Sequence, residues 1–169
     1  RVNLIGEHTD YNDGFVLPAA ITGQSIVAAR ARADRIVTAV AADFGNTVIR
    51  FSLDAPFARD PDAPWADYLR GMALAMEAAG HRLTGAELAI AGDVPRGAGL
   101  SSSASFTVAI GVAMKQLSGL DSLDATAIAK LAQAAECEFV GMRCGIMDQL
   151  ISARGEAGHA LLIDCRSLE

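Results

Sequence analysis

The sequence has few basic residues and no long apolar run, and each shortage excludes a class of protein. Its 169 residues contain 14 Lys and Arg against 20 Asp and Glu, which gives a formal net charge of −6. A broad nucleic-acid-binding surface requires Lys and Arg gathered against phosphates, so this class is excluded, and an anionic ligand would need a local site. The longest apolar stretches, such as residues 104–114, are far shorter than the roughly 20 residues that cross a membrane, so we expect no membrane span.

Cysteine is also scarce. The chain has three, at Cys137, Cys144 and Cys165. An odd number argues against a disulfide framework, and the lack of a CxxC pair argues against a zinc site. The first residues carry no secretory signal pattern, and we therefore predict a cytoplasmic protein. Because the chain opens at Arg1, we expect its natural beginning to lie upstream.

The chain does contain enough apolar material for one folded domain, since 51% of it is hydrophobic. Short β-branched runs, two of them flanking a hairpin signal at residues 43–46, predict an antiparallel sheet within the first 53 residues. After a proline-containing loop at residues 54–64, apolar periodicity predicts helices interleaved with single strands. The predicted strands are residues 15–17, 25–29, 35–40, 47–53, 85–91 and 159–165, and the predicted helices are residues 65–80, 101–117 and 124–140. This order predicts an α+β fold.

A glycine-rich turn followed by serines, residues 92–105 (GDVPRGAGLSSSAS), lies between a predicted strand and a predicted helix. Free backbone N–H groups at a helix start attract anions, and glycine lets a phosphate approach the backbone closely, so this segment is a candidate phosphate-binding loop. It is not a Walker A loop, because Ala98 stands in place of the required Lys, and Ser102 breaks the GxGxxG pattern. An ordinary capped helix is the alternative, but three serines are unfavourable as helix filler and favour phosphate binding.

Polar side chains are also concentrated in the first 14 residues. Glu7, His8 and Asp10, with Asp13 nearby, supply acceptors and one imidazole, the groups that bind a ligand bearing several hydroxyls, such as a sugar. A metal site is one alternative, although a single His and nearby carboxylates match no established ligand spacing. A solvated turn is the other.

Two further candidate carboxylates, Asp148 and Glu136, lie in residues 136–149. Asp148 follows an apolar Gly-Ile-Met step after the third predicted helix, a setting in which partial desolvation would suit a general base. Glu136 lies at the margin of that helix's apolar face and could reach into a pocket. A helix cap or a paired surface charge is the alternative for Asp148.

Taken together, these segments resemble a known family. Residues 1–13 (RVNLIGEHTDYND) resemble the galactokinase signature, and residues 95–105 (PRGAGLSSSAS) resemble the phosphate-binding motif of the GHMP small-molecule kinase superfamily. Residues 141–148 (GMRCGIMD) are similar to the region that carries the catalytic aspartate in galactokinases. Residues 65–71 and 161–169 also fit the family's patterns, in the right order. The resemblance implies a ribosomal-protein-S5-domain-2-like N-terminal domain over residues 1–169, with the family's C-terminal domain absent.

The resemblance also implies a role for individual residues. It makes Asp148 the base for the anomeric hydroxyl and Arg1 the cation beside it. The implied sugar contacts are Glu7, His8, Asp10 and Gly145. The implied ATP contacts are Gly97, Gly99, Ser101, Ser102 and Ser103 at the phosphates, with Trp65 and Tyr68 near the adenine. The implied magnesium ligands are Ser103 and Glu136.

The implied activity is ATP- and Mg²⁺-dependent conversion of galactose to galactose 1-phosphate, with galactose and ATP as the binding partners. A 1-kinase for N-acetylgalactosamine, arabinose or galacturonate is a second reading, and a non-catalytic galactose- and ATP-binding transcriptional sensor is a third. Such sensors are shortened at the Ser-Ala step of the loop, whereas residues 101–105 are complete here, which favours a kinase. Thr107 departs from the Glu that many relatives carry.

Overall fold

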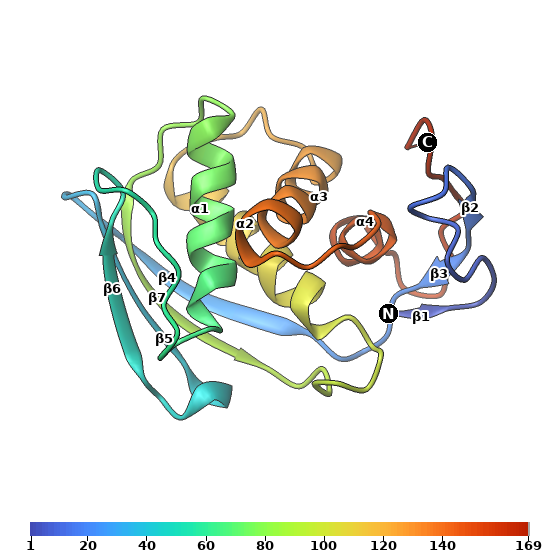
Figure 1. Ribbon diagram of the computed structural model, residues 1–169, viewed down its shortest axis with the longest axis horizontal. Coiled ribbons are helices and arrows are strands. Elements are labelled where there is room, and N and C mark those ends of the chain that lie inside the picture. The colour runs from blue at the N-terminus through green and yellow to red at the C-terminus, as the bar shows by residue number, and fades with distance from the viewer. Residues whose placement is uncertain (169) are drawn as a thin grey trace.

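The computed structural model describes residues 1–168 and contains a four-stranded sheet with helices on one face (Figure 1). The strands are β4 (Ser25–Arg32), β5 (Ile36–Ala41), β6 (Val48–Ser52) and β7 (Gly85–Gly92), in the spatial order β4-β7-β5-β6. Strand β7 is antiparallel to β4 and parallel to β5, and β6 is antiparallel to β5. The predicted α+β arrangement is therefore present.

Side chains alternate between the two faces of the sheet along each strand, and the apolar set marks the face that is buried. In β5, Val37, Ala39 and Ala41 are at most 1% exposed, and they pair in register with the buried Ala86, Leu88 and Ile90 of β7. A short 3₁₀ turn, η1 (Ala42–Phe44), connects β5 to β6 together with Gly45 and Asn46, two residues that each have positive φ. The hairpin predicted from residues 43–46 is thus confirmed.

Three helices cover the buried face: α1 (Ala66–Ala78), α2 (Ser102–Leu117) and α3 (Ala125–Ala134). The predicted α1 is confirmed, and its Leu69, Met72 and Met76 are fully buried. Helix α2 packs closely against it, because a Cβ at Gly111 would lie 2.4 Å from the Met72 Cε atom. No helix within residues 1–168 has both the length and the apolar character that crossing a membrane requires.

The third predicted helix, residues 124–140, is not one α-helix. Helix α3 ends at Ala134 and continues as a π-helix, η2 (Ala135–Val140), which stops at Gly141 with φ = 86°. A π-helical segment has a wider turn and shifts the side chains that follow, and such segments occur frequently at functional sites.

A small lobe stands beside the helices, at the right in Figure 1. It consists of α4 (Met147–Arg154) and two strand pairs, β1 (Val2–Asn3) with β3 (Pro18–Ala19) and β2 (Phe15–Val16) with β8 (Ile163–Asp164). The sequence prediction missed α4. The strand predicted over residues 159–165 is too long, because only β8 and a single bridge between Ala160 and Ala19 form. Residue 169, the end of the 161–169 segment, lies outside the described residues.

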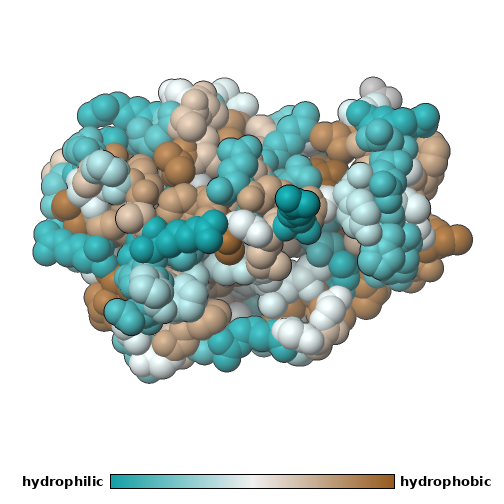
Figure 2. All heavy atoms as spheres, in the orientation of Figure 1, coloured by the Kyte–Doolittle hydropathy of each residue, from teal (hydrophilic) through white to brown (hydrophobic). Residues whose placement is uncertain are grey.

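Several large apolar side chains of the small lobe are exposed at the surface. Figure 2 shows hydrophilic and hydrophobic residues intermixed over the face toward the viewer, with hydrophobic residues at the right-hand edge beside the small lobe. Leu4, Ile5, Phe15 and Leu162 of that lobe are each at least 52% exposed.

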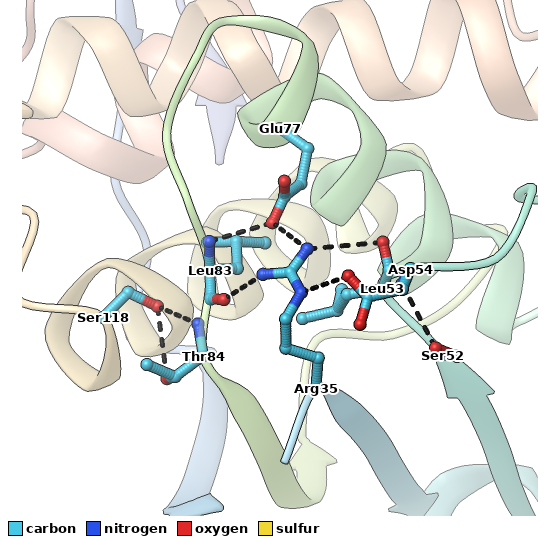
Figure 3. A network of polar contacts seen from close by, with 8 residues as sticks. All are labelled: Arg35, Ser52, Leu53, Asp54, Glu77, Leu83, Thr84 and Ser118. Carbon is cyan, nitrogen blue, oxygen red and sulfur yellow. Dashed lines mark hydrogen bonds and ion pairs between the residues drawn. The ribbon is translucent and has the colours of Figure 1, made fainter. Parts of the chain in front are cut away.

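One arginine ties the sheet to α1 and to the loop before β7 (Figure 3). Arg35 donates to the Asp54 carboxylate (2.5 Å), to the Leu83 carbonyl (2.6 Å) and to the Glu77 carboxylate (3.2 Å). Glu77 also accepts from the Leu83 backbone N–H at 2.9 Å. The Arg35 side chain is only 16% exposed, so these hydrogen bonds and ion pairs compensate the cost of burying its charge.

We expect Arg35→Gln to lower the free energy of unfolding by roughly 2 kcal/mol or more, because it leaves a largely buried Glu77 without its cation. This corresponds to a fall in Tm of about 4–8 °C, measured by calorimetric unfolding. Arg30→Gln is the matched control, since Arg30 is 77% exposed and its ion pair with Glu87 lies at the surface. An Arg35 variant as stable as the Arg30 variant would contradict the assignment.

Candidate active site

The predicted base and its predicted cation form an ion pair, although 147 positions separate them. Asp148 lies in the first turn of α4, and its Oδ1 accepts from Arg1 Nε at 2.6 Å. Its Oδ2 accepts from the Ser101 hydroxyl at 2.6 Å. Arg1 also donates from Nη1 to the Gly99 carbonyl (2.8 Å) and from its backbone nitrogen to the Leu100 carbonyl (3.0 Å). The Asp148 carboxylate is thereby fixed against the glycine-rich loop.

This ion pair remains accessible to a ligand. The Arg1 and Asp148 side chains are 17% and 27% exposed. Each Asp148 oxygen uses one lone pair on the contacts above, so each can accept a further hydrogen bond. A hydroxyl approaching from solvent can therefore meet a carboxylate and a guanidinium side by side.

The glycine-rich loop connects β7 to α2 through backbone that favours glycine. Gly97 and Gly99 have φ = 70° and 71°, and a Cβ at either position would meet nothing within 4 Å. Ser101 adopts φ = 60°, a strained value for a residue with a side chain. Its hydroxyl binds Asp148 and does not cap α2, so the structure does not show the alternative of an ordinary serine-capped helix. No side chain caps α2, so its first N–H groups are available for an anion.

A cavity of about 580 Å³ lies between this loop and α1. Aromatic rings form one wall: Phe44 stacks on Trp65 at 5.9 Å between centroids, and Phe106 lies edge-on to both Trp65 and Tyr68. Ser102 and Ser103 line the cavity as well. The structure thus brings four of the predicted nucleotide contacts, Trp65, Tyr68, Ser102 and Ser103, to one cavity with an apolar wall and hydroxyl groups.

Glu136 of the π-helix is a buried carboxylate, only 1% exposed. Its Oε1 accepts from Gln149 Nε2 at 3.0 Å. Burial raises the pKa of Glu136, and the nearby Asp148 charge raises it further, whereas hydrogen bonding from Gln149, Ser103 and Thr107 lowers it. Within residues 1–168 no Lys, Arg or His forms an ion pair with Glu136. A cation bound here would compensate the buried charge.

The predicted sugar residues are only partly brought together. Asp10 lies directly against the loop before α4, because a Cβ at Gly145 would be 1.8 Å from Asp10 Oδ2. Glu7 and His8 are exposed, and their side-chain hydrogen bonds are to Asn3 and Tyr11 of the same segment. Asp10 therefore meets Gly145, three residues before Asp148, whereas within residues 1–168 no hydrogen bond joins the exposed side chains of Glu7 and His8 to that site.

Comparison with known proteins identifies the family. Residues 67–156, more than half of the chain, match the GHMP kinases N terminal domain, and residues 1–31 match the galactokinase galactose-binding signature. The chain belongs to the GHMP kinase family. Its predicted fold, that of a GHMP kinase N-terminal domain, is confirmed.

Solved structures agree with this membership. The chain is 38% identical to Lactococcus lactis galactokinase, solved in complex with galactose, over 99% of its own length and 43% of that chain, with a TM-score of 0.93. Two more distant kinases share the fold. One is Methanococcus jannaschii mevalonate kinase, at 22% identity over 97% of this chain and 51% of that one, with a TM-score of 0.71. The other is a D-glycero-D-manno-heptose 1-phosphate kinase from Bacteriodes thetaiotaomicron, at 19% identity over 95% and 56%, with a TM-score of 0.74.

The sequence analysis did not single out several residues that lie at this candidate site. Gln149 is 1% exposed and links α4 to the π-helix through Glu136, and its Oε1 is buried without a hydrogen-bond partner. The apolar spacing of Met147, Leu150 and Ile151 could have revealed α4, but Gln149 lies about 150° from the centre of that face, so the pattern gave no sign of its burial. Nothing in the sequence pattern indicated that Phe44, on the η1 turn, would stack on Trp65.

The structure also gives an account of Thr107. Thr107 is fully buried, and its hydroxyl donates to the Ser103 carbonyl at 2.9 Å. Thr107 therefore fills this buried position with its one O–H donor satisfied inside α2, and it adds no second carboxylate to the interior.

Proposed function

We propose that this chain is the N-terminal domain of an ATP- and Mg²⁺-dependent galactokinase, which phosphorylates the anomeric hydroxyl of galactose to give galactose 1-phosphate. The observation that carries the proposal is the Arg1–Asp148 pair, fixed against the glycine-rich loop at 2.6 Å. The galactose-binding signature over residues 1–31 and the 38% identity to a galactokinase support galactose as the sugar.

Two charged groups would act on the reacting hydroxyl. Asp148 accepts its hydrogen bond, orients it and takes its proton as the oxygen attacks the γ-phosphorus. Arg1 keeps its charge at neutral pH and stabilises the negative charge that develops on the oxygen. Because Ser101 and Arg1 hold both carboxylate oxygens, the base is already oriented before the substrate arrives.

The aromatic cavity suits the nucleotide. A purine ring would lie against Trp65 and Tyr68, since flat aromatic surfaces stack favourably. The phosphates would reach the free N–H groups and serine hydroxyls at the start of α2, with Gly97 and Gly99 leaving room for their approach. The γ-phosphoryl group would then pass from the nucleotide in the cavity to the sugar hydroxyl held at Asp148.

The donor set also fits magnesium. Ser103 and Glu136 would hold the ion, since Mg²⁺ prefers a few hard oxygen ligands together with phosphate oxygens and water. The buried, cation-free Glu136 carboxylate supports this fit. When bound, the ion neutralises charge on the phosphate oxygens. The hydrogen bond from Gln149 would orient the Glu136 carboxylate toward that ion.

The domain assignment rests on length as well as on similarity. Residues 1–169 span 43% of the galactokinase chain they match, and we assign them to its N-terminal domain. A site shared between two domains loses contacts when one is missing, so the 169 residues by themselves are expected to show little or no turnover. The three free thiols support a cytoplasmic enzyme.

The test is turnover of the complete enzyme, measured by ADP release with galactose, N-acetylgalactosamine, arabinose and galacturonate. We expect the highest kcat/KM for galactose, loss of activity with EDTA and recovery with added Mg²⁺. A higher kcat/KM for another of these sugars would favour the related 1-kinase. Binding of galactose and ATP with no turnover of any sugar would favour the sensor and refute the kinase proposal.

A further inference from the structure

The cavity assigned to the nucleotide has an unusual charge distribution. Of the described residues that line it, three are charged: Asp43, Asp93 and Arg96. The two carboxylates are already engaged, because Asp43 Oδ2 accepts from the Gly92 N–H at 2.7 Å and Asp93 Oδ1 accepts from the Gln24 N–H at 2.6 Å. They repel an anionic ligand, which leaves Arg96 as the single cation that faces the cavity within residues 1–168.

Arg96 is held in place without using its hydrogen-bond donors. Its guanidinium carbon lies 4.5 Å from the centroid of the Phe44 ring, a cation–π distance, and Phe44 in turn stacks on Trp65. No hydrogen bond or ion pair joins the Arg96 guanidinium to any other group in the part of the chain that the structure describes. Its N–H groups are therefore available to a ligand while its guanidinium lies over the Phe44 ring.

The other arginine of the site cannot perform this task. Arg1 is neutralised by Asp148, and its donors go to that carboxylate and to the Gly99 carbonyl. Arg96 sits one residue before Gly97, at the start of the loop that we assign to phosphate binding. The chain carries a net charge of −6, so a cation beside this loop adds attraction for a polyphosphate to that of the α2 N–H groups.

We propose that Arg96 is a phosphate-binding residue of the nucleotide site, with its guanidinium oriented by Phe44 and its N–H groups donating to phosphate oxygens of the bound nucleotide. This inference rests on the proposed function, since it requires that the cavity bind a nucleotide. Guanidinium and phosphate match in geometry and form charge-assisted hydrogen bonds. The residue acts on nucleotide affinity and takes no part in the proton transfer at Asp148.

The test compares Arg96→Leu and Arg96→Lys with wild type in the complete enzyme, using calorimetric binding of ATP, ADP and adenosine. We expect Arg96→Leu to weaken ATP and ADP binding by roughly tenfold or more, the size of a lost charged hydrogen bond, and to leave adenosine within about twofold. Arg96→Lys should retain part of the affinity, because it keeps the charge and loses the planar fork. High salt should narrow the difference between wild type and Arg96→Leu.

Arg82→Leu is the matched control, because it removes the same charge from an exposed position outside the cavity. It should leave all three dissociation constants unchanged, which shows that net charge alone is not the cause. Unchanged ATP affinity in Arg96→Leu would overturn the inference. An equal loss for adenosine would also overturn it, since Arg96 would then contact the base. Wild type that binds no ATP would refute the proposed function instead.

Discussion

Asp148→Asn in the complete enzyme is expected to lower kcat by roughly 10²- to 10⁴-fold, the usual cost of losing a general base. Asn preserves the shape and both contacts: its oxygen can still accept from Arg1, and its NH₂ group can donate to the Ser101 hydroxyl. It cannot take up the proton of the substrate hydroxyl. The dissociation constants of galactose and ATP should therefore change little, and kcat should carry the loss.

The measurement pairs ADP-release kinetics with calorimetric binding on the same preparations. Asp121→Asn is the control. It makes the same chemical change at a residue that is exposed in the turn between α2 and α3. Near-normal kcat in Asp148→Asn would remove Asp148 as the base. Loss of galactose binding with an unchanged kcat would make it a binding residue instead.

Local sequence patterns were sufficient to predict the helices and strands that bury one apolar face. The β5–β6 hairpin follows from alternation and a turn signal, and α1 follows from apolar residues at helical spacing. Strand β8 was overestimated because its partner β2 lies almost at the other end of the chain, and its length depends on that distant pairing. The π-helix could not be foreseen, since six residues contain too few turns to reveal a changed period.

The site depends still more on distant contacts. Arg1 and Asp148 were paired by resemblance alone, because no spacing rule connects residues 147 positions apart. The loop–helix junction at Ser101 to Ser103 was readable locally, as glycines and serines there need special backbone or free N–H groups. The role of Ser101 was not, since its hydroxyl turns toward Asp148 only once α4 packs beside the loop.

Gly145→Ala is expected to lower kcat/KM for galactose by roughly 10- to 100-fold while leaving ATP binding unchanged, in line with the cost of overpacking a tight site. The added Cβ would lie 1.8 Å from Asp10 Oδ2 and 2.1 Å from its Cγ, so the Asp10 carboxylate must leave its position. Gly145 has no positive φ, and the cost is therefore a steric clash and not backbone strain. Asp10 is a predicted sugar contact, which directs the loss to galactose.

A double-mutant cycle separates this clash from a general loss of structure. Asp10→Ala removes the atoms that the new methyl group would meet, so Gly145→Ala should cost little further in that background, and the two effects should be strongly non-additive. Gly23→Ala is the control, because a Cβ there would be 3.5 Å from its nearest neighbour, an ordinary contact. Additive losses, or a normal kcat/KM in Gly145→Ala, would show that Asp10 and Gly145 do not meet at the sugar site. Non-additivity in galactose kinetics with unchanged ATP affinity would instead support a sugar site at Asp10 and Gly145, separate from the nucleotide cavity.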